Sequence, residues 1–303
     1  MKEVEHFRHP NFRVAWQGFA FTLPKAWEVV SFLHEEKKGT LAFSTESGAK
    51  GQFSYRKVTA VPDIPRIIEE IHRRELGLDV LPRIRFTRHG SQKQVILGHT
   101  GRGERFYASV FNSQARLLNE WIFPSYTPEA AAEVVPMLQS YSDNNPDDHG
   151  RVEYAMFGLE ASIPSGYHLE KIEAYPASVS MTFENSRHFK LMVHRWGMAD
   201  LIMQGASVGN FYHRYLYGRR YAVKEVHYDC DIDGHAGGTV VFRARGKLGF
   251  DFVLGPWWRG EGTGFLKTHE NRIYGVEHIA PIFIKNRESV RDVFRKKLAE
   301  RPR

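Results

Sequence analysis

The chain contains the same pattern of residues twice, and this internal repeat constrains its fold more than any other feature. The stretch GFAFTLPKAW, which begins at Gly18, aligns with GLEASIPSGY, which begins at Gly158, at an offset of 158 − 18 = 140. Farther along, Phe53 aligns with Phe189 at an offset of 189 − 53 = 136. A polar, glycine-bearing hairpin loop lies between the two alignments, and such loops tolerate length changes at little cost. We therefore predict two copies of one domain.

The length of the chain fits this interpretation. A chain of 303 residues is long enough for two domains of ordinary size. We predict that the domains span residues 1–145 and 151–303. The segment SDNNPDDHG between them, residues 142–150, has the polar, proline-containing composition of a linker.

Both copies have the same predicted order of strands and helices. In the first copy, an alternating strand that ends at Pro24 is followed by a hairpin and by a helix over 63–76, in which Asp63 can cap the N-terminus. Four more strands follow, and then a closing helix that begins after Thr127. The predicted fold class is α+β, with two tandem copies of an antiparallel β-sheet domain flanked by helices.

This order of elements resembles the PsbP-like fold. The residues that carry the resemblance are the strand of alternating apolar residues that leads to proline and an aromatic residue, as in GFAFTLPKAW and GLEASIPSGY. The group includes the photosystem PsbP subunits, DcrB-like bacterial proteins, Mog-type Ran-binding proteins and small chaperones of type VI secretion effectors. The resemblance implies a partner-binding, assembly or chaperone module rather than an enzyme.

Charge and cysteine content exclude some classes of partner. The first 148 residues hold 19 Lys and Arg against 18 Asp and Glu, and the remainder holds 23 against 17, an excess of 23 − 17 = 6. This basic half lacks the aromatic-interleaved stripe of a nucleic-acid surface, so we expect no nucleic-acid partner. No segment has the apolar length that crosses a membrane. Because Cys230 is the single cysteine, we expect no intramolecular disulfide and a cytoplasmic protein.

A glycine-bracketed histidine occurs in both copies. GHTG begins at Gly98 and GHAG begins at Gly234, and 235 − 99 = 136 places the two histidines at equivalent positions. A catalytic histidine needs a partner group, and Thr100 of the first copy is replaced by Ala236 in the second. We interpret both glycines as hairpin-turn residues with unusual backbone angles. Ligand binding by the histidines is the alternative.

The strand before the second of these turns is rich in metal-ligand types. In the segment HYDCDIDGH, alternation would place His227, Asp229, Asp231 and Asp233 on one face. Carboxylates and imidazoles bind divalent metals. A strand spreads four such side chains over about 20 Å, however, and a metal needs them to converge. We interpret the pattern as a solvated strand face, and we expect neither a metal nor a cofactor.

The clearest difference between the copies is the segment GPWWRGEGTGFLKTHEN, residues 255–271. We predict that it forms a long connection between the last two strands. Its Trp257, Trp258 and Arg259 are residue types that dominate interface hot spots. Its glycines lack the spacing of a phosphate-binding loop. The alternative role of the tryptophans is to cover a sheet edge or to fill the seam between the domains.

Two hypotheses on function follow. The first is a non-enzymatic protein-binding, assembly or chaperone-like module, built as a duplicated pseudo-dimer, which binds another protein through the tryptophan segment. The second is a small-molecule-binding protein or hydrolase with a site in the second domain or at the domain interface, where His235 and Arg219 would take part. We favour the first, because no reactive constellation occurs in both copies.

Overall fold

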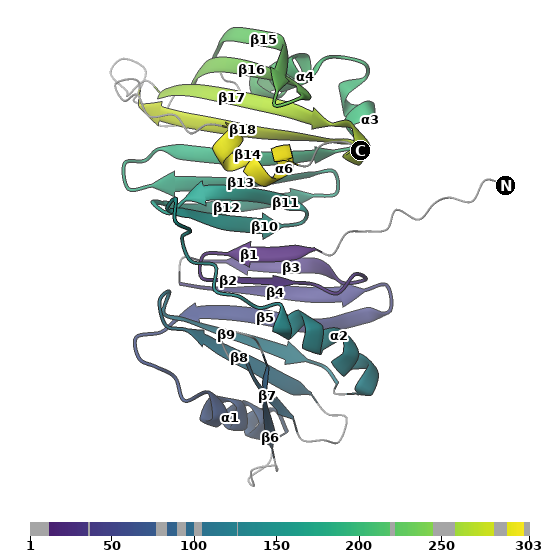
Figure 1. The fold of residues 1–303 in the computed structure, drawn as a ribbon, viewed down its shortest axis with the longest axis vertical. Coiled ribbons are helices and arrows are strands. Elements are labelled where there is room, and N and C mark those ends of the chain that lie inside the picture. Colours follow the sequence, from purple (N-terminus) through teal and green to yellow (C-terminus); the bar gives the residue numbers. More distant parts are fainter. Residues whose placement is uncertain are drawn as a thin grey trace, which may run out of the picture. The chain divides into compact units, whose positions relative to one another are not determined.

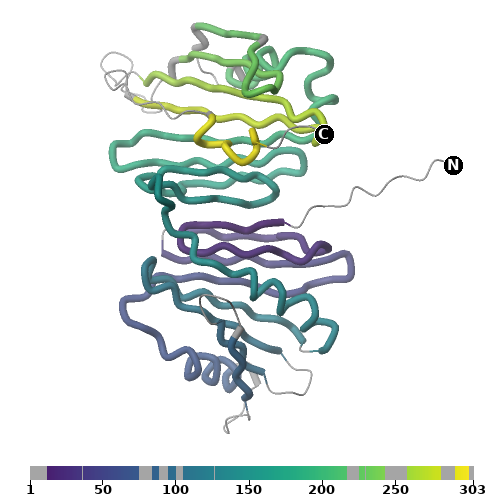
Figure 2. The backbone as a smooth tube through the Cα atoms, viewed as in Figure 1, coloured from purple at the N-terminus to yellow at the C-terminus, as the bar shows by residue number. Residues whose placement is uncertain are grey.

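The computed structural model describes residues 12–35, 37–76, 84–89, 95–99, 105–125, 127–218, 222–244, 258–281 and 290–299. The chain divides into two compact units. The first contains Met1–Asp147 and Val152–Gly158, and the second contains Asp148–Arg151 and Leu159–Arg303. In Figures 1 and 2 the chain is coloured from purple at the N-terminus to yellow at the C-terminus, so the second unit runs from teal at β11 through green to yellow.

Antiparallel strands dominate the described residues. Of these residues 55% lie in strands and 21% in helices, and the strands form three sheets. The predicted class, α+β with two tandem helix-flanked sheet domains, is therefore wrong, and the protein is predominantly β. The second unit contains strands of up to 11 residues, and one of them, β17, runs through the segment that the sequence pattern assigns to a connection.

The first unit is built around one seven-stranded sheet, in the order β3-β4-β5-β9-β8-β7-β6. A second, smaller sheet places β1 between β2 and β10. The strands are β1 (Arg13–Trp16), β2 (Phe19–Thr22), β3 (Glu28–His34), β4 (Lys38–Thr45), β5 (Gly48–Lys57), β6 (Arg85–His89), β7 (Val95–His99), β8 (Phe106–Asn112), β9 (Leu117–Phe123) and β10 (Arg151–Met156). The helices are α1 (Ile64–Leu76) and α2 (Pro128–Gln139).

The two faces of this seven-stranded sheet bury different partners. Phe19 and Phe21 of β2 place their rings 4.7 and 5.1 Å from the ring of Phe53 on one face. On the other face, Ile68 of α1 packs with Tyr107 in an apolar cluster. Aromatic burial of this kind supplies much of the stability of a β protein.

Side-chain caps fix the start of both helices of the first unit. Asp63 accepts the backbone N–H of Arg66 at 3.3 Å, and Thr127 accepts the N–H of Ala130 at 3.2 Å. These caps confirm the predicted helix starts.

The predicted linker is partly fixed to the first unit. Ser142 forms an antiparallel bridge with Ala20. The side chain of Asn144 is buried and donates to the carbonyl of Trp16 at 2.6 Å and to the carbonyl of Glu153. Because the amide of Asn144 satisfies two backbone acceptors, this part of the polar segment is structural.

The second unit contains a seven-stranded sheet in the order β12-β13-β14-β18-β17-β16-β15. Its strands are β11 (Leu159–Pro164), β12 (Tyr167–Tyr175), β13 (Ser178–Asn185), β14 (Lys190–Gly197), β15 (Ala222–Ile232), β16 (His235–Ala244), β17 (Trp258–Lys267) and β18 (Arg272–Pro281). Its helices are α3 (Ala199–Met203), α4 (Val208–Gly218), the 3₁₀ turn η1 (Thr268–Glu270), α5 (Val290–Val293) and α6 (Arg295–Ala299).

The two seven-stranded sheets have the same order of corresponding strands. In the first sheet Leu41 pairs with Phe53, and in the second Met181 pairs with Val193. The offsets are 181 − 41 = 140 and 193 − 53 = 140. The predicted change of offset at Phe189 is therefore wrong, because the register of the hairpin keeps the value of 140. Phe53 and Phe189 share a residue type but not a position in the sheet. The hydrogen-bonded register shows that Val193 is the counterpart of Phe53.

Glycines on β17 and β18 form a flat surface on which helix α4 packs. The ring of the fully buried Tyr212 lies against Gly262, Gly264 and Gly275. A Cβ atom on Gly275 would lie 2.8 Å from Cε2 of Tyr212 and 2.9 Å from Cζ3 of Trp196. Such separations are too short for carbon atoms, so only glycine lets the helix approach this closely. The glycines of GEGTG thus have a packing role.

Within the described residues, no helix is long and apolar enough to cross a membrane.

The close packing of Tyr212 and Trp196 on Gly275 predicts that a larger residue at this position will destabilise the fold. Substitution Gly275→Ala will lower the free energy of unfolding by about 1–3 kcal/mol, because the new methyl group overpacks the contact with Tyr212 and Trp196. Gly166→Ala is the matched control, since no atom lies within 4 Å of its added Cβ. Urea unfolding of both variants measures the difference. Equal stability of the two variants would contradict the overpacking argument.

Candidate functional site

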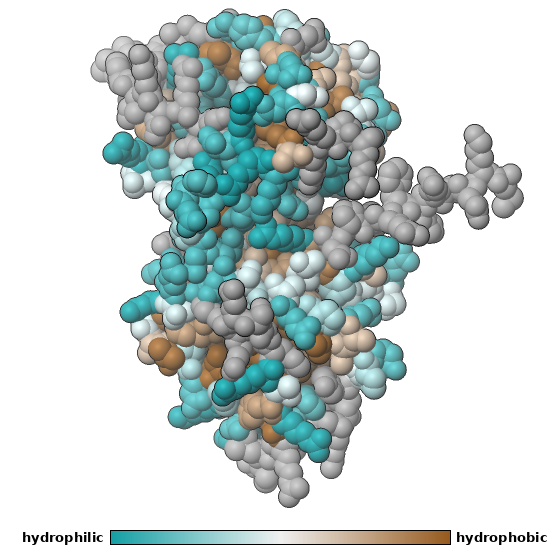
Figure 3. Space-filling view, in the orientation of Figure 1, coloured by the Kyte–Doolittle hydropathy of each residue, from teal (hydrophilic) through white to brown (hydrophobic). Residues whose placement is uncertain are grey.

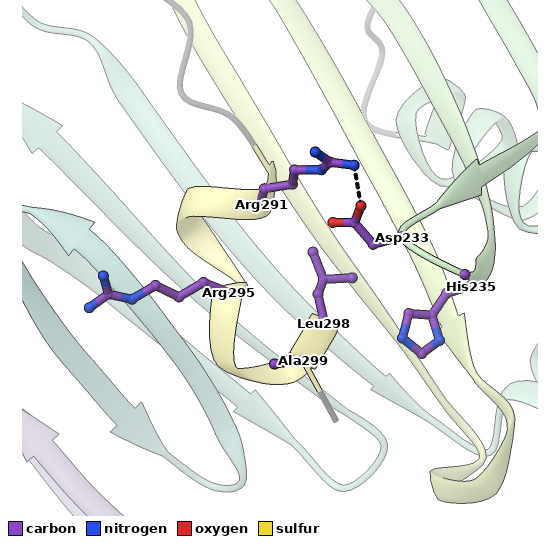
Figure 4. A pocket seen from close by; sticks show the side chains of 7 residues that line it. Asp233, His235, Arg291, Arg295, Leu298 and Ala299 are labelled. Atoms are coloured by element: carbon purple, nitrogen blue, oxygen red, sulfur yellow. Dashed lines mark hydrogen bonds and ion pairs between the residues drawn. The ribbon is translucent and has the colours of Figure 1, made fainter. Parts of the chain in front are cut away.

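Two hollows in the second unit share His235. The larger, with a volume of about 820 Å³, lies between the β15–β16 turn and the helices α5 and α6 (Figure 4). It is lined by Asp233, Gly234, His235, Arg291, Arg295, Leu298 and Ala299. The smaller, of about 470 Å³, lies on the α3–α4 side. It is lined by Met203, Ser207, Val208, Cys230, Asp231, His235, Ala236, Gly237 and Leu266.

The turn before His235 has a conformation that its sequence favours. Ile232 pairs with His235, so that Asp233 and Gly234 form a two-residue hairpin loop. Both have positive φ, at 52° and 86°. This is the geometry of a type I′ turn, for which Asp-Gly is a preferred pair. The backbone N–H of Gly234 donates to the carboxylate of Asp231 at 2.9 Å, which fixes the turn further.

His235 is a buried side chain with a perturbed pKa. It is 6% exposed, and its ring lies 5.6 Å from that of Phe265. Burial, followed by the nearby Lys267 and His269, lowers the pKa of His235 from its ordinary value. The backbone of Leu298 and the carboxylate of Asp231 oppose this shift but do not cancel it. The neutral ring is thus the favoured form in the fold.

One ion pair spans the larger hollow. The guanidinium of Arg291 on α5 contacts the carboxylate of Asp233 in the turn (Figure 4). The pair joins the C-terminal helices to the β15–β16 hairpin. Arg291 is largely exposed, so the pair contributes little to stability.

The predicted glycine-histidine repeat is not a structural repeat. Gly234 lies in a hairpin turn with positive φ, as predicted, and begins GHAG there. Gly98 instead lies inside β7, where it pairs with Phe86 and where a Cβ would lie 2.6 Å from Cγ2 of Ile68. The hairpin-turn interpretation of Gly98 and the equivalence of the two stretches are therefore wrong. Thr100 lies outside the described residues.

The predicted tryptophan connection is a strand. Trp258–Lys267 forms β17, which pairs with both β16 and β18 in the interior of the sheet. Trp258 is half-buried and packs against the core cluster that contains Trp196 and Phe242. Arg259 is exposed and faces Glu261 at 3.6 Å. The prediction of a long connection between the last two strands is therefore wrong.

Two predicted site residues, Trp257 and Arg219, lie outside the described residues. Of the three predicted binding residues that the structure describes, His235 alone lines a described hollow.

Strand β15, which contains His227 and Asp231, is not the regular strand that the sequence pattern predicts. The register of β15 with β16 shifts between His227 and Cys230, which interrupts the alternation of faces. His227 contacts the carboxylate of Glu225 at 3.0 Å. The thiol of Cys230 donates to the carbonyl of His227 at 3.8 Å. The described part of the chain contains no group of three or more side chains that could hold a metal ion.

Each unit also presents an exposed apolar residue at the same place, a feature that we did not predict. Val61 is 79% exposed in the connection between β5 and α1, and Leu201 is 64% exposed in α3, between β14 and α4. Their offset, 201 − 61 = 140, is the offset of the preceding strands. We call Val61 and Leu201 the apolar anchors.

Hydrogen bonds hold both anchor segments to the last hairpin of their own sheet. The N–H of Val58 donates to the carbonyl of Arg116 at 2.9 Å, and the N–H of Ala199 donates to the carbonyl of Asn271 at 3.0 Å. Arg116 and Asn271 have φ of 53° and 52°. The offset between Arg116 and Asn271 is 271 − 116 = 155. The residue pairs that close the two hairpins have the same offset, because Asn112 pairs with Leu117 in the first unit and Lys267 pairs with Arg272 in the second.

Side chains add to this restraint. In the second unit Asp200 and Asn271 bond reciprocally: the backbone N–H of Asp200 donates to Oδ1 of Asn271 at 3.0 Å, and Nδ2 of Asn271 donates to Asp200 at 2.7 Å. In the first unit, the guanidinium of Arg116 donates to the carbonyl of Thr59 at 3.4 Å. The guanidinium of Arg214 reaches the carbonyl of Met203, at the end of α3, at 3.4 Å. An arginine therefore hydrogen-bonds the backbone of each anchor segment.

Comparisons with known proteins find no family. No family model and no curated protein matches the chain. Among solved structures, the immunity protein TplEi of T6SS from Pseudomonas aeruginosa, complexed with "L" peptide, has a TM-score of 0.37 at 10% identity, over 96% of this chain and 95% of that chain. Its apo structure has a TM-score of 0.34 at 9% identity, over 94% and 93%.

A third structure belongs to a Pseudomonas aeruginosa protein of unknown function. It has a TM-score of 0.24 at 10% identity and covers 46% of this chain and 99% of that chain. All three TM-scores are below 0.5, so none of these likenesses carries an inference about function.

The buried His235 predicts a pH dependence of stability. Because the fold lowers the pKa of His235 below the ordinary value of 6.5, the unfolded chain binds this proton more readily than the folded chain. The contribution of neutral His235 is complete above pH 6.5 and is lost as the pH falls toward the folded-state pKa. Urea unfolding between pH 8 and pH 5 should show a smaller acid loss for His235→Gln than for wild type. Parallel pH profiles of the two proteins would contradict this assignment.

The position of Trp258 predicts a role in stability. Trp258→Ala will lower the free energy of unfolding by about 2 kcal/mol, less than the roughly 3–5 kcal/mol typical of a fully buried tryptophan. Arg259→Ala, next in sequence but exposed, will leave it almost unchanged. Chemical denaturation compares the two. A tryptophan variant as stable as the arginine variant would show that Trp258 has no packing role.

Proposed function

We propose that this chain is a non-enzymatic protein-binding module, and that the apolar anchors Val61 and Leu201 contact another protein. The observation that carries the proposal is the occurrence of a highly exposed apolar side chain at the same offset in both units. An exposed large apolar side chain gains free energy when a partner covers it. The resemblance to PsbP-like proteins stays a prediction and implies the same kind of function.

The rigidity of the anchor segments supports binding rather than chance exposure. A flexible exposed loop loses conformational entropy on binding, which weakens affinity. The bonds from Arg116 and Asn271 to the anchor segments restrict that freedom before a partner arrives. Pre-ordered apolar side chains are efficient contacts for this reason.

The surroundings of the anchors indicate the chemistry of the partner. Arg116 lies beside the Val61 segment, and Arg214 beside the end of α3. On the face drawn in Figure 3, apolar patches are small and separated by hydrophilic residues. A surface with isolated apolar contacts and neighbouring cations fits a folded protein with apolar pockets and an acidic rim.

The anchors can be tested by site-specific photocrosslinking in the native cell. A benzoylphenylalanine residue at position 61 and, separately, at position 201 should crosslink the same partner protein, which mass spectrometry identifies. Tyr175 is the matched control, because it is also 64% exposed but its counterpart at offset 140 is the charged Glu35. Crosslinks to this chain alone, or equal crosslinks from position 175, would contradict the proposal.

The identified partner then allows a quantitative test. Leu201→Glu should weaken its binding at least about tenfold, because the change buries an unpaired carboxylate in the interface. Leu33→Glu, at another exposed apolar residue of the first unit, should leave affinity unchanged. Unaltered thermal unfolding of both variants confirms that the fold persists. Equal affinity of Leu201→Glu and wild type would remove Leu201 from the interface.

A further inference from the structure

The smaller hollow of the second unit combines apolar walls with one acidic side chain. Its volume of about 470 Å³ lies in the range of small-molecule sites. The apolar side chains of its lining are Met203, Val208, Ala236 and Leu266. Val208 is buried, and Met203 and Leu266 pack against the same core cluster beneath α4. The walls of the hollow are therefore a continuation of the hydrophobic core.

The register of the β15–β16 hairpin directs the side chain of Asp231 toward this hollow. Asp231 pairs with Ala236, and paired residues of an antiparallel ladder point to the same face. Ala236 shares that face with Gly238, on which α4 packs. His235 alternates to the opposite face, where its ring lies 5.6 Å from that of Phe265. Asp231 is thus the charged side chain on the α4 face of this hairpin.

The carboxylate of Asp231 can accept a further hydrogen bond. Its Oδ1 accepts the backbone N–H of Gly234 at 2.9 Å, and an ionised carboxylate has capacity for several donors. Asp231 forms no ion pair with the part of the chain that the structure describes, and the guanidinium of Arg214 donates instead to the carbonyl of Met203 at 3.4 Å. Because Asp231 is exposed, a ligand can reach the carboxylate from solvent.

The other polar side chains of the lining are weaker acceptors. The hydroxyl oxygen of Ser207 accepts the backbone N–H and the side-chain Nδ2–H of Asn210 at 3.3 and 3.2 Å, which uses both of its lone pairs. The thiol of Cys230 lies 3.8 Å from the carbonyl of His227, and a thiol sulfur accepts only weakly. No Lys or Arg is among the described residues of the lining. The charge of this lining therefore favours a cation over an anion.

The hollow is held open by rigid neighbours. A Cβ atom on Gly238 would lie 2.4 Å from Cα of Gly209, and one on Gly209 would lie 2.5 Å from Cα of Tyr228. Helix α4 therefore packs directly on the backbone of β15 and β16. The bond from Gly234 fixes Asp231 on the other side of the hollow. A ligand thus meets walls that are already ordered, which lowers the entropic cost of binding.

We infer that this hollow binds a primary alkylammonium group. The ammonium pairs with the carboxylate of Asp231, and the apolar stem lies against Met203, Val208 and Leu266. A free aliphatic amine and a lysine side chain both present this combination of an apolar stem and a terminal charge. The site is separate from the apolar anchors and does not depend on the proposed function.

Ligand-observed NMR titration of the full chain, at neutral pH and fixed ionic strength, tests the site with butylamine, pentylamine and hexylamine. Binding should be saturable, and each methylene that the walls bury should tighten it about threefold to fourfold. The control ligand is 1-hexanol, which has the stem of hexylamine without the charge. It should bind at least about fivefold more weakly than hexylamine, because it forms no ion pair with Asp231.

Two neighbouring carboxylates of the same turn provide matched variants. Asp231→Asn removes the charge but keeps an oxygen that accepts the N–H of Gly234, so the turn persists. It should weaken hexylamine binding at least about fivefold. Asp233→Asn makes the same change of charge, keeps a favoured Asn-Gly pair and does not line the smaller hollow. It should bind hexylamine like wild type, and unchanged thermal unfolding of both variants checks the fold.

A further titration, with Nα-acetyl-lysine methylamide, distinguishes the source of the ammonium group. Saturable binding that Asp231→Asn weakens assigns the site to lysine side chains as well, whereas binding of hexylamine alone assigns it to free amines. Absence of saturable hexylamine binding, equal affinities for hexylamine and 1-hexanol, or equal losses in the two variants would overturn the inference.

Discussion

One backbone hydrogen bond in each unit fixes the relation between the end of the sheet and the helix that follows its third strand. The acceptors are the carbonyls of Arg116 and Asn271, and the donors are the N–H groups of Val58 and Ala199. Arg116 and Asn271 both adopt a left-handed conformation. That conformation is unfavourable for a residue with a side chain, although less so for Asn than for Arg. The tight hairpin requires a left-handed residue at this position. The hydrogen bond to the anchor segment offsets part of the free energy that this conformation costs.

Two different surfaces depend on this one turn. The residues before and after Asn271 are Glu270 and Arg272, which form an ion pair at 3.6 Å, whereas the backbone and side chain of Asn271 hold α3. The fixed turn therefore holds the α3 segment, which carries Leu201, next to a charged pair. In the first unit, Arg116 holds the anchor segment through its backbone carbonyl and its guanidinium.

Local patterns in the sequence predict much of the secondary structure but less of its arrangement. Helix α1 begins beside the predicted cap Asp63, and α2 beside Thr127, because capping and amphipathic spacing depend on neighbours in the chain. Strand β17 was missed, because its glycines lack strand propensity and contact Tyr212 of a distant helix instead. The α+β class is wrong because strands predominate over helices in the described residues, and β17 is one strand that the sequence pattern assigns to a connection.

The candidate sites could be predicted only in part. The hairpin turn at Gly234 could be predicted from the sequence, whereas the burial of His235 and its position in the larger hollow depend on distant elements, among them α5 and α6. The exposure of Leu201 depends on tertiary packing, because an apolar residue in an amphipathic segment is usually expected inside. The ion pairs of Glu270 combine residues from the β17–β18 hairpin and α6, and no local spacing in the sequence unites them.

The charges of the second unit are arranged in two contrasting ways. Beneath α4, the buried His194 faces the buried Glu277 at 3.1 Å, and the hydroxyl of Tyr212 reaches the same carboxylate at 3.5 Å. Both side chains of this pair are buried, so solvent and salt screen their interaction little. At the β17–β18 turn, by contrast, Glu270 lies 3.6 Å from Arg272, which is 26% exposed, and 3.6 Å from Lys297 of α6, which is 14% exposed. Water reaches these groups, so solvent screens their attraction more strongly. The pair with Lys297 nevertheless joins α6 to the last hairpin of the sheet, and it therefore depends on the same turn in which Asn271 adopts its left-handed conformation.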